Sequence, residues 1–109
     1  MLGEFEYLVL SSAARLGSGA YGVTIGDEIE RVTGRRCSIG ALYTTIDRLE
    51  KKGFLQTRMG EATSERGGRR KRQVRLTAEG RREAKAFYDA VVRASEGVAW
   101  QARPPRVRA

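Results

Sequence analysis

The sequence contains no histidine and only one cysteine, Cys37. Without histidine the chain cannot form a Ser-His-Asp triad, use imidazole as a general base, or bind a metal through imidazole. A single cysteine excludes an intramolecular disulfide. The neighbouring groups Thr44, Thr45 and Asp47 lack a base partner. We therefore expect a protein that is not an enzyme, with no catalytic residue, cofactor or metal site.

Long apolar runs are also missing, and none approaches the roughly 20 residues of a membrane-spanning helix. The N-terminal residues are acidic, whereas a secretory signal peptide starts with basic residues. A length of 109 residues favours one domain with a modest core. These features predict a cytoplasmic protein that has no membrane partner.

Positive charge is abundant but unevenly distributed. The formal net charge is +8, from 21 Lys and Arg against 13 Asp and Glu. Residues 1–34 carry 2 − 5 = −3, residues 35–76 carry 12 − 4 = +8, and residues 77–109 carry 7 − 4 = +3. A charge that served solubility alone would be spread more evenly. The concentration in the middle of the chain predicts a polyanionic partner, most often nucleic acid.

The hydrophobic pattern predicts three helices followed by a β-hairpin and a fourth helix. Apolar residues recur at helical spacing in 4–16, 21–33 and 38–52, and Gly34 and Gly53 follow the second and third segments. Residues 54–60 and 71–76 alternate like strands, and the polar loop between them carries Gly67 and Gly68.

The spacing of residues along the third and fourth helices predicts which side of each faces inward. Ser38 and Thr77 are expected N-caps. On the third helix we expect an inner side formed by Ile39, Leu42, Tyr43, Ile46 and Leu49. In the first strand Leu55, Thr57 and Met59 alternate with Gln56 and Arg58. In the second strand Val74 and Leu76 should point inward, and Arg72 and Arg75 outward or partly so. The fourth helix should run to about Ala99 and carry a heptad-like seam of Ala84, Tyr88, Val91, Ser95 and Val98, with Phe87 and Val92 beside it.

This order of elements is that of a winged helix-turn-helix, so the expected fold is mostly α with a small β-hairpin. A DNA major groove, about 12 Å wide, admits one helix, and side chains near its leading end read the bases. The polar side of residues 38–52 is small, hydroxylic and then cationic, with Ser38, Thr44, Thr45 and Arg48 as the groove-facing set. The basic segment 66–72 would form a wing on the DNA backbone or in the minor groove.

Several motifs together resemble the PadR family of bacterial transcriptional regulators. They are LGEFEYLVL, AYGVTIGDEIE, ALYTTIDRLEKKGFL, the GE…ERGGRRKR segment and RLTAEG, which span about residues 2–80. Each motif is weak alone, but their combination is specific. Many family members have aromatic residues after the wing lysine, whereas this chain has Arg72, Gln73 and Val74. The resemblance is to members with a short C-terminal region.

The resemblance implies a winged-helix domain at 1–76 and a dimerisation helix at 77–100. It implies a homodimeric repressor that binds an inverted-repeat operator in double-stranded DNA. The prolines and arginines of the last residues predict a disordered basic tail at 101–109. Together with Ser38, the residues expected to contact DNA are Tyr43, Thr44, Thr45, Arg48, Lys51, Gly68, Arg69, Arg70 and Lys71. The residues expected at the dimer interface are Phe5, Ala84, Phe87, Tyr88, Val91, Ser95 and Val98.

Four features keep an alternative interpretation. Tyr43 belongs either to the core or to the DNA edge. Cys37, beside two arginines, is either a redox switch or a partly buried small residue, and the second is commoner. Trp100 either lines an effector pocket at a dimer interface or covers the core, which we favour. The G-x-G-x-x-G pattern at 17–22 follows a helix rather than a strand, so it predicts a turn and no nucleotide site.

The main rival function is non-specific binding to nucleic acid, as in a nucleoid-type or RNA-binding protein. RNA-binding sheets usually expose aromatic side chains on which bases stack. The predicted hairpin carries Arg and Thr instead, which favours DNA. The operator, the target genes and any small-molecule effector are not encoded in a recognisable pattern.

Overall fold

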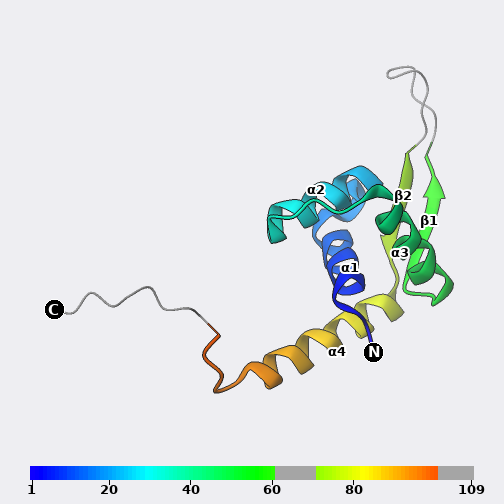
Figure 1. Ribbon diagram of the computed structural model, residues 1–109. Coiled ribbons are helices and arrows are strands. Elements are labelled where there is room, and N and C mark those ends of the chain that lie inside the picture. Colours follow the sequence, from blue (N-terminus) through cyan, green and yellow to red (C-terminus); the bar gives the residue numbers. More distant parts are fainter. Residues whose placement is uncertain (61–70, 101–109) are drawn as a thin grey trace.

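The computed structural model describes residues 1–60 and 71–100 and confirms the predicted order of elements (Figure 1). The helices are α1 (Glu4–Leu16), α2 (Gly22–Thr33), α3 (Ile39–Lys51) and α4 (Ala78–Ser95), and the short 3-10 helix η1 (Gly17–Gly19) follows α1. The strands are β1 (Leu55–Met59) and β2 (Arg72–Leu76). None of the helices in the described ranges is long and apolar enough to cross a membrane.

Local hydrogen bonds explain why the helices begin and end where they do. The Ser38 hydroxyl accepts from the Ala41 amide at the start of α3, and the Thr77 hydroxyl accepts from the Gly80 amide at the start of α4. Both are N-caps that satisfy an amide with no partner inside the helix. Gly34 ends α2 with a φ of 76°, a left-handed conformation that costs glycine little.

The hairpin is antiparallel, and Leu55 pairs with Leu76 at its base. Its second strand has a further neighbour, because the Val74 amide donates to the Ala20 carbonyl and Tyr21 forms a bridge with Gln73. These bonds attach the hairpin to the segment between η1 and α2. The orientation of the hairpin is therefore set by the helical domain.

The core lies where α1, α2, α3 and the base of the hairpin meet. Its largest fully buried side chains are Leu10, Ile25, Ile46, Leu49, Leu55 and Val9. Two carboxylates are also buried at its edge. Glu28 of α2 pairs with Arg15 and Arg31, and Glu6 of α1 accepts from Lys52, just past α3. The hydrogen bond from Arg31 is the main reason that the pKa of Glu28 lies below its usual value.

The fourth helix is anchored at its first turn and leaves the domain at its other end (Figure 1). The Thr77 hydroxyl donates to the Gly53 carbonyl. The centre of the Phe87 ring lies 5.0 Å from the centre of the Tyr7 ring of α1. Beyond Phe87 the helix exposes apolar side chains, with Tyr88 55% and Val91 45% exposed. The second half of α4 is therefore an unpaired apolar surface within the single chain.

Four expectations from the sequence were wrong in detail. On α3, Ile39 is 72% exposed and Thr45 only 5%, because the inner face begins at Leu42 and Thr45 lies between Leu42 and Leu49. The last helix ends at Ser95, where the chain turns before Gly97 at a φ of 75°. Trp100 is 78% exposed, so it does not cover the core of its own chain.

Replacing Gly80 with alanine should destabilise the fold. A Cβ at this position would overlap the Phe54 carbonyl oxygen and press on the Leu76 side chain. Overpacking of this kind costs about 1–3 kcal/mol, which chemical denaturation would measure. Gly40→Ala is the matched control, because nothing lies within 4 Å of its Cβ position and alanine favours a helix. Equal stability of the two variants would contradict the close packing of α4 on Phe54.

Glu6→Gln should lower stability at neutral pH but much less in acid. Burial raises the pKa of Glu6, but hydrogen bonds from the Gly3 amide and Lys52 outweigh it, so the pKa lies below its ordinary 4.5. The ionised group therefore stabilises the fold above pH 4.5, and this contribution is lost as pH falls through the lowered pKa. We expect a loss of about 1–2 kcal/mol at pH 7.

Measured unfolding free energies at pH 7 and pH 3 test this expectation. Glu4→Gln is the control, since Glu4 is an exposed carboxylate in the same helical turn. A Glu6→Gln effect that stays constant from pH 7 to pH 3 would show that the charge of Glu6 is not what matters.

Candidate nucleic-acid interface

The leading half of α3 presents an exposed surface without acid, on which Ile39 is the one large exposed side chain. The first turn of the helix contains no acidic residue, and Ser38, Gly40, Ala41 and Thr44 are exposed. The free amides of a helix N-terminus and the helix dipole both favour a negatively charged group. This end of α3 can therefore approach a phosphate or the edges of bases closely.

Two cations follow on the same helix. Arg48 and Lys51 are exposed, and neither forms an ion pair within the described part of the chain. Arg48 lies close enough to Glu6 to help lower the pKa of that carboxylate. A guanidinium that has no fixed partner is free to donate two hydrogen bonds to a guanine or a phosphate.

Tyr43 and Thr45 differ from the rest of the predicted DNA-contacting set. Thr45 is buried on the inner face, so the structure corrects its assignment to the exposed polar side. Tyr43 is half-buried and packs on the core, with its hydroxyl against Gly22, where a Cβ would overlap it. The side chain of Tyr43 thus fixes the contact between α2 and α3, and only its rim is accessible.

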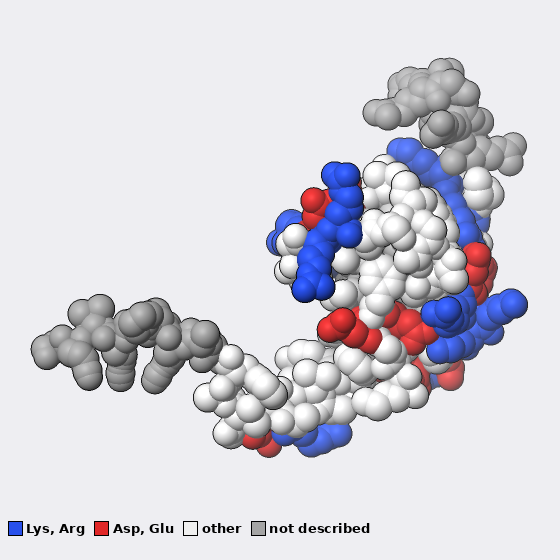
Figure 2. All heavy atoms as spheres, viewed as in Figure 1, with Lys and Arg blue, Asp and Glu red and all other residues white. Residues whose placement is uncertain are grey.

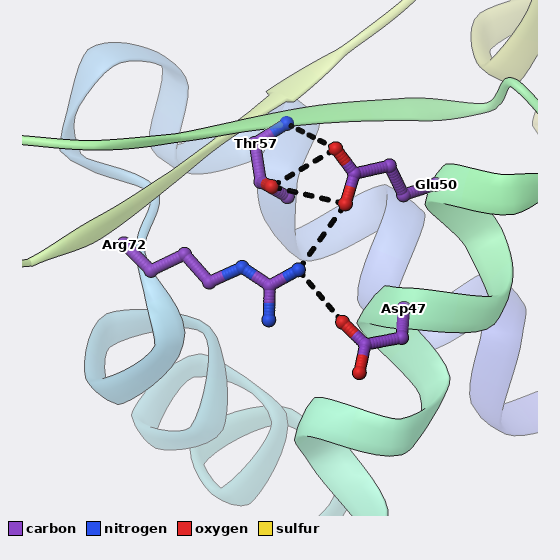
Figure 3. A network of polar contacts seen from close by, with 4 residues as sticks. All are labelled: Asp47, Glu50, Thr57 and Arg72. Carbon is purple, nitrogen blue, oxygen red and sulfur yellow. Dashed lines mark hydrogen bonds and ion pairs between the residues drawn. The ribbon is translucent and has the colours of Figure 1, made fainter.

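A network of polar contacts joins α3 to the hairpin (Figure 3). One Arg72 nitrogen lies 2.7 Å from an Asp47 oxygen and 3.2 Å from a Glu50 oxygen. Thr57 of β1 completes the network, since its amide and hydroxyl both donate to Glu50, at 3.0–3.2 Å. Arg72 therefore connects β2 to two turns of α3 and compensates one of the two negative charges of Asp47 and Glu50.

The base of the expected wing is described, but its tip is not. The Gly60 amide donates to the Lys71 carbonyl at 2.7 Å, and the Lys71 ammonium lies 4.6 Å from the centre of the Tyr21 ring. Gly68, Arg69 and Arg70 lie outside the described residues, as does the tail at 101–109. Lys71 is exposed, so it remains available to an anion at the edge of the hairpin.

Basic side chains surround this region of the surface. Figure 2 shows Lys and Arg along the hairpin and at the end of α3 on one side of a largely uncharged strip, and near α2 on the other. Such a distribution attracts a polyanion over a distance of about 10 Å at 0.1 M salt. Across residues 1–60 and 71–100, no group of His, Cys, Asp and Glu could hold a metal ion.

Two sequence features outside this surface have simple structural roles. The glycines of the G-x-G-x-x-G pattern form η1 and the turn into α2, without the preceding strand that a dinucleotide site needs. Cys37 is exposed to an intermediate degree beside the core and has a free thiol. This exposure fits the partly buried small residue, the commoner of the two interpretations, and the redox switch stays the untested alternative.

The predicted dimer residues fall into two groups. Phe5, Ala84 and Phe87 are half-buried and pack against the core of their own chain. Tyr88, Val91 and Val98 are exposed, as is Val92, which the sequence had placed only beside the seam. The Ser95 hydroxyl donates to the Val91 carbonyl at 2.7 Å. The free apolar surface is thus the outer half of α4 and the residues just after it.

Comparison with known proteins agrees with this description. The model of the transcriptional regulator PadR-like family matches residues 9–86. A transcriptional regulator from Clostridium thermocellum superposes with a TM-score of 0.70, at 24% identity over 90% of this chain and 92% of its own. None of the curated proteins compared with the chain matches it.

Two further structures have the same architecture. F93 from STIV, a winged-helix DNA-binding protein, has a TM-score of 0.70 and 22% identity, over 89% of this chain and 97% of its own. Bacillus subtilis PadR in complex with operator DNA has a TM-score of 0.61 and 19% identity, over 96% of this chain and 52% of its own. The predicted winged-helix fold is confirmed.

Arg72→Ala should loosen the hairpin from α3. The substitution removes both ion pairs of the Arg72 side chain, which is only 24% exposed, and leaves Asp47 and Glu50 without their shared cation. We expect a loss of about 1–2 kcal/mol of unfolding free energy, more than an isolated surface pair provides. Lys85→Ala, which breaks an exposed pair with Asp89 one helical turn away, is the control. The prediction fails if both variants lose the same small amount.

Proposed function

The chain belongs to the transcriptional regulator PadR-like family, and from that premise we propose that it is a homodimeric repressor that binds an inverted-repeat operator. In this proposal α3 enters the major groove and the wing at 66–72 follows the flanking backbone. The protein acts on DNA rather than as an enzyme. Its location is the cytoplasm, the compartment in which a bacterial chromosome is regulated.

The exposed leading half of α3 carries the proposal. It offers small, hydroxyl-bearing side chains at Ser38 and Thr44. Arg48 and Lys51 follow, and neither forms an ion pair among the described residues. The hydroxyls and the helix N-terminus suit phosphates, and Arg48 suits base readout because a guanidinium pairs bidentately with guanine. Tyr43 supports the helix from behind, and the buried Thr45 is left out of the contacting set.

The wing contributes charge rather than sequence readout. Lys71 is the described member of the set, and Gly68, Arg69 and Arg70 are proposed from the sequence alone. Arginines and lysines beside glycines fit a phosphate backbone or a minor groove without discriminating strongly between sequences. Because Arg72 is engaged with Asp47 and Glu50, we assign it to holding the wing and not to the DNA.

The outer half of α4 is the proposed dimer surface, in particular Tyr88, Val91, Ser95 and Val98. Apolar side chains on one side of a helix that leaves the domain need a partner to remove them from water. Phe5, Ala84 and Phe87 border this surface while serving their own core. A two-fold dimer would place its two α3 helices on half-sites about 34 Å apart, one turn of DNA.

Binding to the DNA upstream of the protein's own gene tests the proposal. Fluorescence anisotropy would compare that duplex with a scrambled duplex at two salt concentrations. A specific regulator should bind its site about 10³-fold or more tightly than the scrambled one. Equal and steeply salt-dependent binding to every duplex tried would favour the rival, a non-specific nucleic-acid-binding protein.

Arg48→Ala should reduce operator affinity by about 1–3 kcal/mol and relax the preference at one base position. Lys51→Ala, a phosphate contact in this proposal, should weaken all sequences alike and lower the salt dependence. Arg93→Ala is the control, since it removes an exposed charge from the far end of α4. If Arg48→Ala bound each single-base variant of the operator as the wild type does, base readout by Arg48 would be wrong.

A further inference from the structure

The hairpin has a second basic face that the proposed function does not use. Side chains alternate along a strand, so residues 72, 74 and 76 share one side of β2 and residues 73 and 75 the other. Arg72 reaches α3 and Val74 is buried, which makes the first side the inner one. Gln73 and Arg75 therefore point away from α3.

The register places four polar side chains on this outer face. Gln56 lies opposite Arg75, and Arg58 lies opposite Gln73. All four are exposed. Neither arginine forms an ion pair within the described part of the chain, although Arg72 on the inner face forms two. Two free guanidinium groups and two amides thus form a surface made mainly of hydrogen-bond donors.

This face is also hollowed. It borders an open concavity of about 840 Å³ that is further lined by Ser18 of η1 and by Arg81 in the first turn of α4. The same concavity reaches Glu50 of α3 and the inner-side residues Thr57 and Val74. Arg81 is exposed and makes no ion pair among the described residues. The single acidic residue in the described lining, Glu50, already accepts hydrogen bonds from Thr57 and Arg72. The concavity therefore holds three guanidinium groups that form no ion pair among residues 1–60 and 71–100.

The geometry points to a second segment of duplex DNA, held by its phosphate backbone, as the ligand of this outer face. Guanidinium groups bind phosphates through paired hydrogen bonds, and amides and hydroxyls add neutral donors that carry no sequence information. The concavity is far larger than one phosphate and is open, which suits a repeating backbone. Because the face points away from α3, the operator segment held by α3 leaves it free.

This inference rests on the proposed function, which supplies the first DNA segment. One protein dimer would hold its operator through α3 and the wings, and a neighbouring duplex segment through Arg58, Arg75 and Arg81. The binding to the second segment would depend on salt and not on sequence. The consequence would be that a bound regulator can bring two stretches of DNA together.

A two-duplex capture experiment tests this. The full-length protein is saturated with a labelled operator duplex, and an unrelated duplex with a second fluorophore is added while energy transfer between the labels is measured. The wild-type complex should capture the second duplex. Removing one phosphate contact should lower the slope of log affinity against log salt concentration by about 0.9. The triple variant Arg58→Gln/Arg75→Gln/Arg81→Gln should therefore lower this slope by up to about 2.7 per chain. It should also weaken capture of the second duplex about tenfold or more.

Two matched variants control for net charge and for folding. Arg82→Gln/Lys85→Gln/Arg93→Gln removes three charges from α4, outside the concavity, and should leave capture unchanged. Arg58→Lys/Arg75→Lys/Arg81→Lys keeps the charge and should retain most of the capture. Loss of capture in the glutamine variant of the outer face alone would support the inference.

The outcomes separate the inference from the function on which it rests. If the wild type prefers its operator to a scrambled duplex but captures no second duplex, the inference is overturned and the regulator stands. Equal capture by the wild type and the outer-face glutamine variant overturns it too. If no duplex is preferred in the first step, the proposed function fails. In that case, weaker salt-dependent DNA binding by the glutamine variant would still support phosphate binding by the outer face, and unchanged binding would overturn it.

Discussion

Arg72 donates from β2 to Asp47 and Glu50 of α3, and this contact determines how the two halves of the candidate interface lie relative to each other (Figure 3). Without it, the second half of α3 would present two uncompensated carboxylates to an approaching polyanion. With it, one of the two negative charges is compensated, and Arg48 and Lys51 are the cations of α3 that form no ion pair among the described residues. The same guanidinium thus links the strand to the helix and shapes the surface potential.

The apolar core supports this contact from below. Ile46 and Leu49 of α3 are fully buried in the core shared with α1, α2 and Leu55, so the helix cannot rotate without exposing them. The bond between Val74 and Ala20 holds the hairpin from its other edge. Charged groups at the border of the core, Glu6 and Glu28, are each paired with cations from another element or turn. The exposed half of α3 is therefore presented by a rigid frame.

The molecule has two cationic surfaces and one apolar surface, and these lie in different places. The α3 face and the outer face of the hairpin are both rich in cations. Side chains alternate along β2, so the outer face is the side of the strand opposite to the one that contacts α3. The outer half of α4 is apolar and projects away from both (Figure 1). A dimer built on α4 would leave the two basic faces of each chain accessible, which is what simultaneous contact with two DNA segments would require.

Element order, N-caps and charge distribution followed from the sequence because each depends on neighbours within a few residues. Ser38 and Thr77 cap their helices as predicted, and the middle of the chain carries the positive charge. Burial at the edges of elements did not follow. Thr45 and Ile39 exchanged the places that hydrophobicity alone would assign, because the packing partners of α3 cover Thr45 and leave the first turn uncovered. The tertiary structure also decided which arginines are free. Arg72 and Arg75 look equivalent in the sequence, but Arg72 pairs with two carboxylates, whereas Arg75 is exposed to solvent. Only the strand register and the position of α3 distinguish them, because the partner of each charge depends on which distant side chain folding brings within hydrogen-bonding distance.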